Sequence, residues 1–311
     1  MTKDHIYIIG AGAVGKVLAV ALKLSGKKVT LLRGSVDKQS AYLEKIQILQ
    51  DNKTELEETI EISTLSHFPE LNGIVILTNK SYGNKQLAET LQQKTGTSPI
   101  VILQNGLGIE QPFLDLGFPE IYRCVLFMTS QNTNGQKISY KPVSVSPIGT
   151  IKSNNNHLQE IVEQINTVHF QFRAETDIQP VIWKKAIINS VFNSICPLLE
   201  TDNGIFHRDQ EVLEMAKRVI GECLAIAREK GILLNDHQVL ENLLLISKFS
   251  DGQLISTLQD INNNRKTEIE TLNFEIVRIA GTLHKENLVR ETKLLGELTR
   301  IKSDLKRNPE L

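Results

Sequence analysis

The stretch "IYIIGAGAVGKVLAV" (residues 6–20) decides the fold of the N-terminal half. An apolar run typical of a buried strand leads into Gly10, Gly12 and Gly15, which have G-x-G-x-x-G spacing, and good helix formers follow. In such a unit the first glycine permits a tight turn, the second lets a pyrophosphate approach the backbone, and the third lets the helix pack on the sheet. The helix N-terminus offers N–H donors to phosphates. We therefore predict a dinucleotide-binding loop formed by Gly10, Ala11, Gly12, Ala13, Val14 and Gly15.

The segments that follow extend this unit into a sheet. Nearly continuous apolar runs at 28–33, 73–78 and 99–104 are typical of parallel strands that are buried on both faces, and helical stretches alternate with them. Further strands are expected at 122–130, 142–149 and 168–175, with a turn at "NTNGQ" (132–136).

Helical periodicity replaces the strands after about residue 178. Helices are expected at 179–199, 209–230, 236–247 and, in two pieces, 266–307. The pattern predicts an α/β protein, in which an N-terminal Rossmann-type doubly wound sheet is followed by an all-helical C-terminal domain. We expect the domains to span 1–175 and 176–311, with Pro180 in the first turn of the leading helix. A cleft between two such domains is a usual place for a site.

Composition excludes several classes of partner. The chain has 311 residues, a formal net charge of −1, 41% hydrophobic and 23% charged residues, which is ordinary for a soluble globular protein and gives no electrostatic reason to expect nucleic acid or a membrane surface. The three cysteines are far apart and lack CxxC spacing, so we expect reduced thiols and no metal site. No apolar run is long enough for a membrane helix or a signal peptide, so a cytoplasmic protein is expected.

The end of the second strand indicates which dinucleotide is bound. A site for NAD places a carboxylate there to bind the ribose hydroxyls, whereas this chain has Arg33. A guanidinium can pair with the 2′-phosphate of NADPH, and Asp37 comes late enough to lie in a loop. NADPH is the predicted cofactor, and a solvated arginine at the strand end is the alternative.

Polar residues also follow two other strands of the predicted sheet. "ILTNKS" puts Lys80 after one strand, and "ILQNGLG" puts Asn105 after the next. Ligands of open α/β sheets bind beyond the carboxyl ends of the strands. Lys80 could therefore meet a carboxylate or a phosphate, and Asn105 could bond ribose or the nicotinamide carboxamide. Taken singly, each is better explained as a loop residue.

The helix "WKKAIINSVFNSI" (183–195) carries a polar stripe beside its apolar face. Lys185, Asn189 and Asn193 recur at intervals of four residues, whereas Lys184 shares its stripe with Ile188. A solvated face would favour long charged residues, and asparagine is a poor helix former with a directional amide. The stripe is predicted to face a polar ligand, with Lys185 as the residue that contacts it.

A second polar motif, "ISTLQDINNNRKTEIETLN" (255–273), brings Ser256 and two glutamates into the helical half. Helical spacing does not separate Glu268 from Glu270. No histidine of the chain falls in a dehydrogenase motif, and His207 is better explained by a capping or surface role.

These motifs together resemble the ketopantoate reductase (2-dehydropantoate 2-reductase) family over essentially the whole chain. The resemblance rests on GAGAVG, the arginine that ends the second strand, "TNKS", "QNGLG", "WKKAIINSVFNSI" and "STLQDINNNRKTEIETLN", in this order and spacing. The chain departs from the family at Phe274, where glycine is common, and in "QPVI" before Trp183, which lacks charged residues. Both departures bear on the shape of the substrate pocket more than on the reaction type.

The resemblance implies roles for individual residues. Lys185 is the implied general acid and Glu268 the implied catalytic partner, which also contacts cofactor. Asn189, Asn193 and Ser256 are implied substrate contacts, and Lys80 and Asn105 contact both substrate and cofactor. The implied reaction is NADPH-dependent reduction of a small 2-oxo acid, ketopantoate, to (R)-pantoate in pantothenate and coenzyme A biosynthesis.

The sequence also allows two alternative functions. An NADPH-dependent reductase of another 2-oxo or 3-oxo acid would share the two-domain plan. A non-catalytic NADPH-sensing protein would keep the glycine loop and Arg33 but would not need Lys185, Asn189, Ser256 and Glu268 together. A helical second domain of this type can also form a homodimer.

Overall fold

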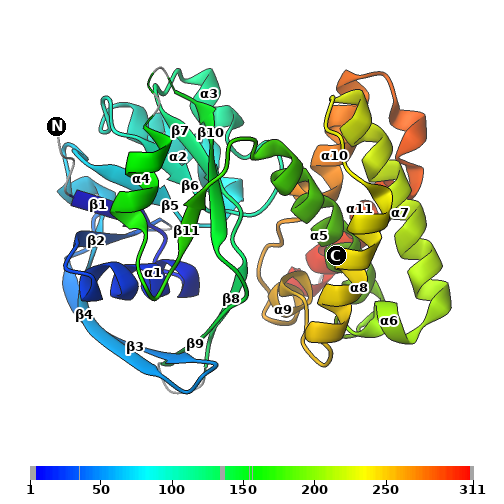
Figure 1. Ribbon diagram of the computed structural model, residues 1–311, viewed down its shortest axis with the longest axis horizontal. Helices are drawn as coiled ribbons and strands as arrows, with labels where there is room; N and C mark the ends of the chain where they lie inside the picture. Colours follow the sequence, from blue (N-terminus) through cyan, green and yellow to red (C-terminus); the bar gives the residue numbers. More distant parts are fainter. Residues whose placement is uncertain (1–4, 35, 134–136, 154, 156, 309–311) are drawn as a thin grey trace. The chain divides into compact units, whose positions relative to one another are not determined.

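The computed structural model describes residues 5–34, 36–133, 137–153, 155 and 157–308. The chain divides into two compact units (Figure 1). The N-terminal unit consists of Met1–Asn105 and Ile109–Ile178, and the helical unit consists of Gly106–Gly108 and Gln179–Leu311.

One sheet of eleven strands forms the N-terminal unit, in the order β11-β10-β7-β6-β5-β1-β2-β4-β3-β9-β8. Its strands are β1 (His5–Ile9), β2 (Lys28–Arg33), β3 (Tyr42–Gln50), β4 (Glu55–Thr64), β5 (Ile74–Leu77), β6 (Ile100–Ile102), β7 (Ile121–Cys124), β8 (Met128–Asn132), β9 (Lys137–Pro142), β10 (Ser146–Lys152) and β11 (Phe172–Ala174).

The central part of the sheet confirms the predicted Rossmann-type fold. Strands β4, β2, β1, β5, β6 and β7 are all parallel, and their order corresponds to the 3-2-1-4-5-6 arrangement of dinucleotide-binding sheets. The strand order reverses at β1, where the chain continues to β2 on one side while β5 pairs on the other. The loop after β1 therefore lies at the position where ligands of such sheets bind.

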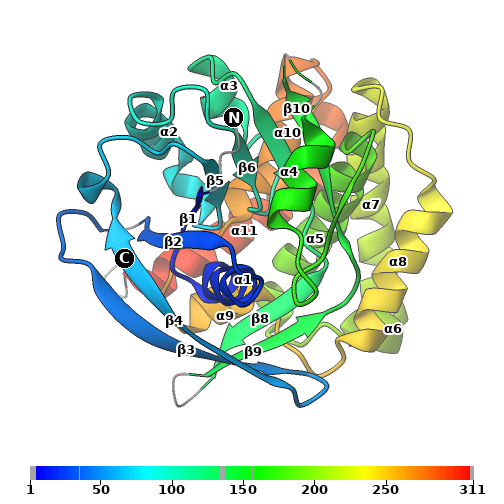
Figure 2. The same ribbon diagram turned by 60° about the vertical axis from the view of Figure 1, so that its left-hand side comes forward.

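The sheet curls around α1 (Ala13–Leu24), which packs against β2, β4 and β8. Figure 2 shows this helix end-on, with β1, β2, β4, β3, β9 and β8 around it. The apolar residues of α1 join those of β3 and β4 in one core; Leu18, Ile46 and Ile60 belong to it. Three further short helices complete the unit: α2 (Asn84–Gln92), α3 (Gln111–Asp115) and α4 (Leu158–Ile165).

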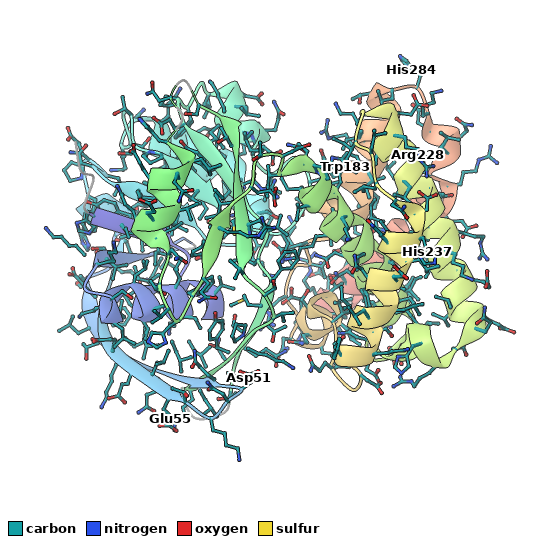
Figure 3. All side chains as sticks on the ribbon, in the orientation of Figure 1. Asp51, Glu55, Trp183, Arg228, His237 and His284 are labelled. Atoms are coloured by element: carbon teal, nitrogen blue, oxygen red, sulfur yellow. The ribbon has the colours of Figure 1, made fainter. Side chains whose placement is uncertain are left out.

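Three strands were absent from the sequence prediction. β3 and β4 form an antiparallel hairpin whose turn carries Asp51 and precedes Glu55, both labelled in Figure 3, and β9 pairs with β3. Charged and apolar residues alternate along β3 and β4, because only one face is buried, and such strands lack the continuous apolar run of a buried parallel strand.

Two other expectations for this region have different outcomes. The strand expected at 122–130 is in fact two strands, β7 and β8, which are separated by residues 125–127. The turn expected at 132–136 falls largely outside the described residues.

The helical unit contains α5 (Gln179–Leu199), α6 (Ile205–Arg208), α7 (Gln210–Glu229), α8 (Asp236–Phe249), α9 (Ser256–Asn262), α10 (Asn273–Thr282) and α11 (Arg290–Arg307), with short 3-10 turns η3 (Ile269–Thr271) and η4 (Glu286–Leu288). The described part of this unit has no strand, as predicted. Asp209 caps α7 by accepting from the N–H groups of Glu211 and Val212. Among the described residues, no helix is both long and apolar enough to cross a bilayer.

Candidate cofactor and substrate sites

The glycine loop after β1 depends on glycine at two points. Gly10 has φ +124°, and a Cβ there would lie 2.4 Å from Asn79 N and 2.7 Å from Thr78 C, both backbone atoms. Thr78 donates its hydroxyl to the carbonyl of Gly10 at 2.9 Å, which fixes the loop against the end of β5. A Cβ on Gly15 would lie 2.0 Å from Gly10 O, so α1 approaches the loop as closely as the sequence argument expected.

The N-terminus of α1 is open to a ligand. Gly12 is the N-cap residue and is exposed; an added Cβ would meet nothing within 4 Å. No side chain caps the helix, and its first turn carries no acidic residue. Ala11, Ala13 and Val14 are half-buried and pack on the core. The backbone N–H groups of this 12-residue helix and its positive dipole end can therefore receive a phosphate.

Arg33 ends β2, as predicted, and its guanidinium bonds to the side-chain oxygen of Gln39. Asp37 lies in the loop beyond, where its carboxylate accepts from the backbone N–H of Ser66 at 2.9 Å. Hydrogen bonds from the Ser66 hydroxyl and N–H lower the pKa of this carboxyl to about 2, so it is ionised at neutral pH. The end of β2 thus carries the guanidinium of Arg33, whereas the carboxylate of Asp37, farther along the loop, is bound by Ser66 of η1 (Leu65–His67).

The predicted strand-end residues both lie at the carboxyl edge of the sheet. Lys80 is exposed and precedes a 3-10 turn, η2 (Ser81–Gly83), and Asn105 is exposed just beyond β6. Sequence reasoning missed Asn79, which lies between them and the glycine loop. Its Oδ1 is buried and, among the described atoms, lacks a hydrogen-bond partner, while its Cβ would lie 3.1 Å from a Cβ on Gly34. The motif "TNKS" contained this residue, but nothing in the sequence distinguished it.

On α5, the three predicted polar residues have different environments. Lys185 and Asn189 are half-buried, whereas Asn193 is only 3% exposed. Asn193 donates to Asn189 O at 2.9 Å, and its Oδ1 accepts from the Ser256 hydroxyl and from Thr257 N–H, each at 3.2 Å. Asn193 therefore caps the start of α9 from another helix, since that helix has no capping side chain of its own. The structure brings Asn193 and Ser256 together.

The two glutamates that spacing left equivalent are clearly different in the structure. Glu268 is half-buried and begins η3, where its carbonyl accepts from the N–H and hydroxyl of Thr271, each at 3.1 Å. Glu270 is exposed and forms an ion pair with Arg300 on α11 at 3.6 Å. Of the two, Glu268 alone is partly shielded from solvent.

The segment Gly106–Gly108, directly after Asn105, packs on η3. Leu107 N–H bonds to Thr271 O at 2.8 Å, and Gly106 has φ +114° and leaves no room for a Cβ, which would lie 2.5 Å from Thr271 Oγ1. The turn that begins at Glu268 therefore holds the backbone adjacent to Asn105. The hydrogen bond from Leu107 to Thr271 thus joins the "QNGLG" motif to the second polar motif, about 160 residues later in the sequence.

Phe274, the departure from the family pattern, packs on α11. The guanidinium of Arg300 lies 4.5 Å above its ring centroid, and a Cβ on Gly296 would lie 3.6 Å from the ring. A side chain at position 296 would thus meet the ring at an ordinary van der Waals distance.

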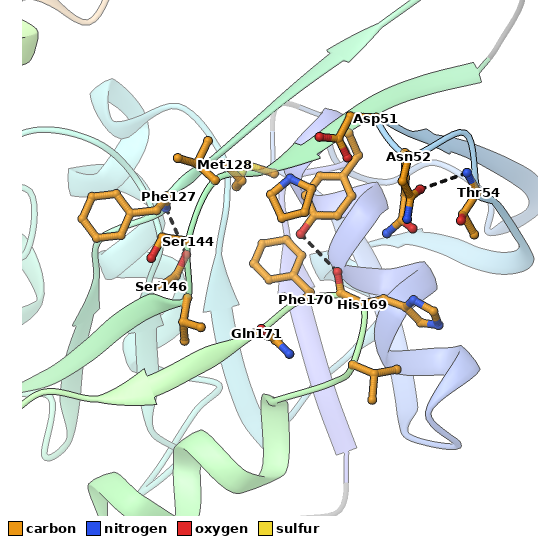
Figure 4. Close-up of a pocket in the computed structure, with 16 residues that line it drawn as sticks. Asp51, Asn52, Thr54, Phe127, Met128, Ser144, Ser146, His169, Phe170 and Gln171 are labelled. Atoms are coloured by element: carbon orange, nitrogen blue, oxygen red, sulfur yellow. Dashed lines mark hydrogen bonds between the residues drawn. The ribbon is translucent and has the colours of Figure 1, made fainter. Parts of the chain in front are cut away.

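A hollow of about 630 Å³ opens in the N-terminal unit, but none of the predicted residues lines it (Figure 4). Its walls come from the β3–β4 turn, the start of β8, the end of β9 and residues 168–171. Tyr140 donates to His169 O at 3.1 Å and stacks on Phe170, and burial raises the pKa of Tyr140 to about 12. The described residues also hold no cluster of His, Cys, Asp or Glu that could bind a metal.

The strand order, the open glycine loop and the cation at the end of β2 define a dinucleotide-binding protein of the Rossmann type. Residues 6–151 match the model of the family described as ketopantoate reductase PanE/ApbA, and residues 177–294 match that of its C-terminal domain. The chain belongs to the ketopantoate reductase family, a family of oxidoreductases.

Individual relatives are distant but cover nearly all of the chain. The 2-dehydropantoate 2-reductase of Pyrococcus horikoshii is 28% identical over 90% of this chain and 92% of its own. A dimeric ketopantoate reductase from Staphylococcus aureus has the same fold, with a TM-score of 0.80, 18% identity, and coverage of 97% of this chain and 99% of that one. D-mandelate dehydrogenase, in a ternary structure with NADH and anilino(oxo)acetate, has a TM-score of 0.82 at 20% identity, covering 97% and 99%.

Proposed function

We propose that this protein is an NADPH-dependent 2-oxo acid reductase that converts 2-dehydropantoate to (R)-pantoate, a step of pantothenate and coenzyme A biosynthesis. In this proposal residues 1–175 form the domain that binds the cofactor, and residues 176–311 form the domain that supplies the acid. Family membership supports the reaction class. The observation that carries the proposal is the half-buried Lys185 on the polar stripe of α5, beside Asn189.

The residues present fit a nicotinamide dinucleotide. The uncapped N-terminus of α1, the free space at Gly12 and the unpartnered Asn79 Oδ1 make a cradle with donors and one open acceptor. Gly10 to Gly15, Arg33, Lys80 and Asn105 would hold the group. When bound, it supplies the hydride for the carbonyl carbon of the substrate.

The side chains of the protein stabilise the charge that develops in the reaction and supply the proton. Negative charge develops on the substrate oxygen, and the Lys185 ammonium stabilises it and donates the proton. Ser256 would bind the substrate carboxylate by turning toward it the single hydroxyl hydrogen that it donates to Asn193 Oδ1 in the structure. Lys80 is proposed as a further carboxylate contact. Asn189 would bond to the substrate, because the described contacts give its side-chain amide no protein partner. Glu268 would orient the substrate hydroxyl and Lys185.

The acid role is tested with purified protein by following the nicotinamide absorbance with 2-dehydropantoate, with other 2-oxo acids, and with NADH in place of NADPH. Lys185→Ala should lower kcat by about 10² to 10⁴-fold, the usual contribution of a general acid, and leave NADPH affinity unchanged. The adjacent Lys184→Ala is the matched control and should retain turnover. Equal losses of kcat and NADPH affinity in Lys185→Ala would contradict the acid role.

Arg33 tests the cofactor assignment. Arg33→Ser should weaken NADPH binding by about 10 to 100-fold, since a hydrogen bond to a charged group contributes about 1.5–3 kcal/mol, and should leave NADH binding unchanged. Arg173, which pairs with Glu175 on the surface, provides the control Arg173→Ser. Stronger binding of NADH than of NADPH by the unaltered protein would refute the NADPH proposal.

A second candidate is reduction of a different 2-oxo or 3-oxo acid. It is supported by the fold shared with D-mandelate dehydrogenase and by Phe274 at a position where the family often has glycine. Turnover of another acid faster than 2-dehydropantoate would favour it. NADPH binding without turnover of any acid would favour the non-catalytic sensor.

We also propose a homodimer, on the strength of the dimeric relative. Four apolar residues on α11 are 43–55% exposed and recur at intervals of four, three and four, which gives one unpaired apolar stripe: Leu294, Leu298, Ile301 and Leu305. Light scattering of Leu298→Lys should then give the monomer mass where the unaltered chain gives twice that mass. A monomeric unaltered chain would refute it.

A further inference from the structure

Two buried amides face each other behind the strand-end loops. Asn84 is the first residue of α2 and Gln104 directly precedes Asn105; their side chains are 2% and 6% exposed. Each amide donates to the other, Asn84 Nδ2 to Gln104 Oε1 and Gln104 Nε2 to Asn84 Oδ1, both at 2.8 Å. This reciprocal pair has a single mutual geometry, because both bonds require the two planar groups to be in register.

The second N–H of each amide bonds to a backbone carbonyl. Gln104 Nε2 donates to Asn79 O at 2.8 Å, and Asn84 Nδ2 donates to Ile109 O at 2.9 Å. All four amide hydrogens of the pair are therefore used. The two side chains thus connect Asn79, which precedes Lys80, with the segment that leads to Asn105. They also connect both to Ile109, where the chain returns to the N-terminal unit.

Neighbouring contacts hold this pair in place. Leu103, the residue before Gln104, donates its N–H to Leu77 O at 3.0 Å and so fixes the chain to the sheet. At the return point, Glu110 forms an ion pair with Arg123 of β7, which is only 2% exposed. Because unpaired buried amides are costly, the pair has one stable arrangement, and the carbonyl of Asn79 must stay within reach of Gln104.

We propose that Asn84 and Gln104 are positioning residues that set the separation of Lys80 and Asn105, so that both can contact one bound dinucleotide. The inference rests on the proposed cofactor site at this edge of the sheet. The amides act through the loops: Gln104 is adjacent to Asn105 in the chain and bonds the carbonyl of Asn79, which is adjacent to Lys80. Losing Gln104 removes the bond to Asn79 O outright, and losing Asn84 removes the two bonds that fix the orientation of the Gln104 amide.

The test is a double-mutant cycle in cofactor affinity. Asn84→Leu, Gln104→Leu and the double variant are made in the full chain, and the NADPH Kd is measured by titration of NADPH fluorescence. Each single variant should raise Kd by at least about tenfold, since misplacing a binding group by about 1 Å can cost as much as 10²-fold. The double variant should bind about as weakly as the weaker single one, because either change breaks the whole pair.

The control removes a buried hydrogen bond of the same unit away from the loops. Thr95 is 2% exposed and bonds to Leu91 O, so Thr95→Val should lower the melting temperature without changing Kd. If the amide variants lower the melting temperature but leave Kd unchanged, or if the effects of the two single changes on Kd multiply in the double variant, the proposal is wrong. If the unaltered protein binds NADH and not NADPH, the proposed cofactor is wrong. The positioning role is then tested by measuring the Kd for NADH with the same variants. Binding of neither cofactor would overturn both.

Discussion

Asn193 and Asn189 lie one helical turn apart on α5, yet we expect only the removal of Asn193 to lower stability. Asn193→Ala removes three hydrogen bonds, including the cap on Thr257 N–H, at about 1 kcal/mol each. Alanine returns up to about 0.7 kcal/mol through helix propensity. The net loss is about 2 kcal/mol. Asn189→Ala loses no described side-chain bond and should be neutral or slightly stabilising.

The assay is urea unfolding followed by the fluorescence of Trp183, the only tryptophan of the chain. It is 4% exposed on α5 and therefore reports on the helical unit (Figure 3). With an m-value of about 2 kcal/mol/M, a loss of about 2 kcal/mol moves the midpoint down by about 1 M. Asn189→Ala should keep the midpoint while raising the KM for the oxo acid. An unchanged midpoint in Asn193→Ala would refute the capping role of Asn193.

Three further predictions concern the N-terminal unit and the thiols. Gly10→Ala should destabilise the cofactor-free protein by at least about 2 kcal/mol, because of its φ and the backbone contact at 2.4 Å, whereas Gly12→Ala should keep the melting temperature and weaken NADPH binding; equal melting temperatures would contradict this. Asp37 has a folded pKa of about 2, below the ordinary 3.8, so its stabilisation is present above about pH 4 and is lost as the pH falls toward 2. The difference in melting temperature between Asp37→Asn and the unaltered chain should accordingly shrink between pH 5 and about pH 3. Because the carboxylate is exposed, its contribution to the free energy of unfolding should stay below about 1 kcal/mol. Burial raises the pKa of Cys196 and Cys223 to about 12, so a thiol reagent should label them only in denaturant, and rapid labelling of the native protein would show that the burial is wrong.

Local patterns in the sequence were sufficient for the central fold. Gly10, Gly12 and Gly15 indicated a strand, a turn and a helix, because their spacing within one short segment is itself the signature of this unit. The predicted helix at 179–199 coincides with α5 because its apolar periodicity is long and uninterrupted. The β3–β4 hairpin was missed, since alternating charged residues also suit an exposed helix or loop.

The candidate site was predictable only in part, because its decisive contacts join distant segments. The stripe on α5 follows from helical spacing, but that Asn193 caps α9 depends on a partner more than 60 residues away. Composition could not separate Glu268 from Glu270; the ion pair of Glu270 with Arg300 does. The amide pair of Asn84 and Gln104 likewise has no local signature.

The short segment Gly106–Gly108 also changes how the chain can be divided. Because it belongs to the helical unit while its neighbours on both sides belong to the other, the polypeptide passes from one unit to the other three times rather than once. A protein with a single crossing could be expressed as two separate halves. Cutting this chain after Ile178 would leave Thr271 O without the N–H of Leu107, and would leave the loop that follows Asn105 without its support. The C-terminal fragment then lacks part of its own unit, and the N-terminal fragment carries three residues that pack on a turn it does not contain.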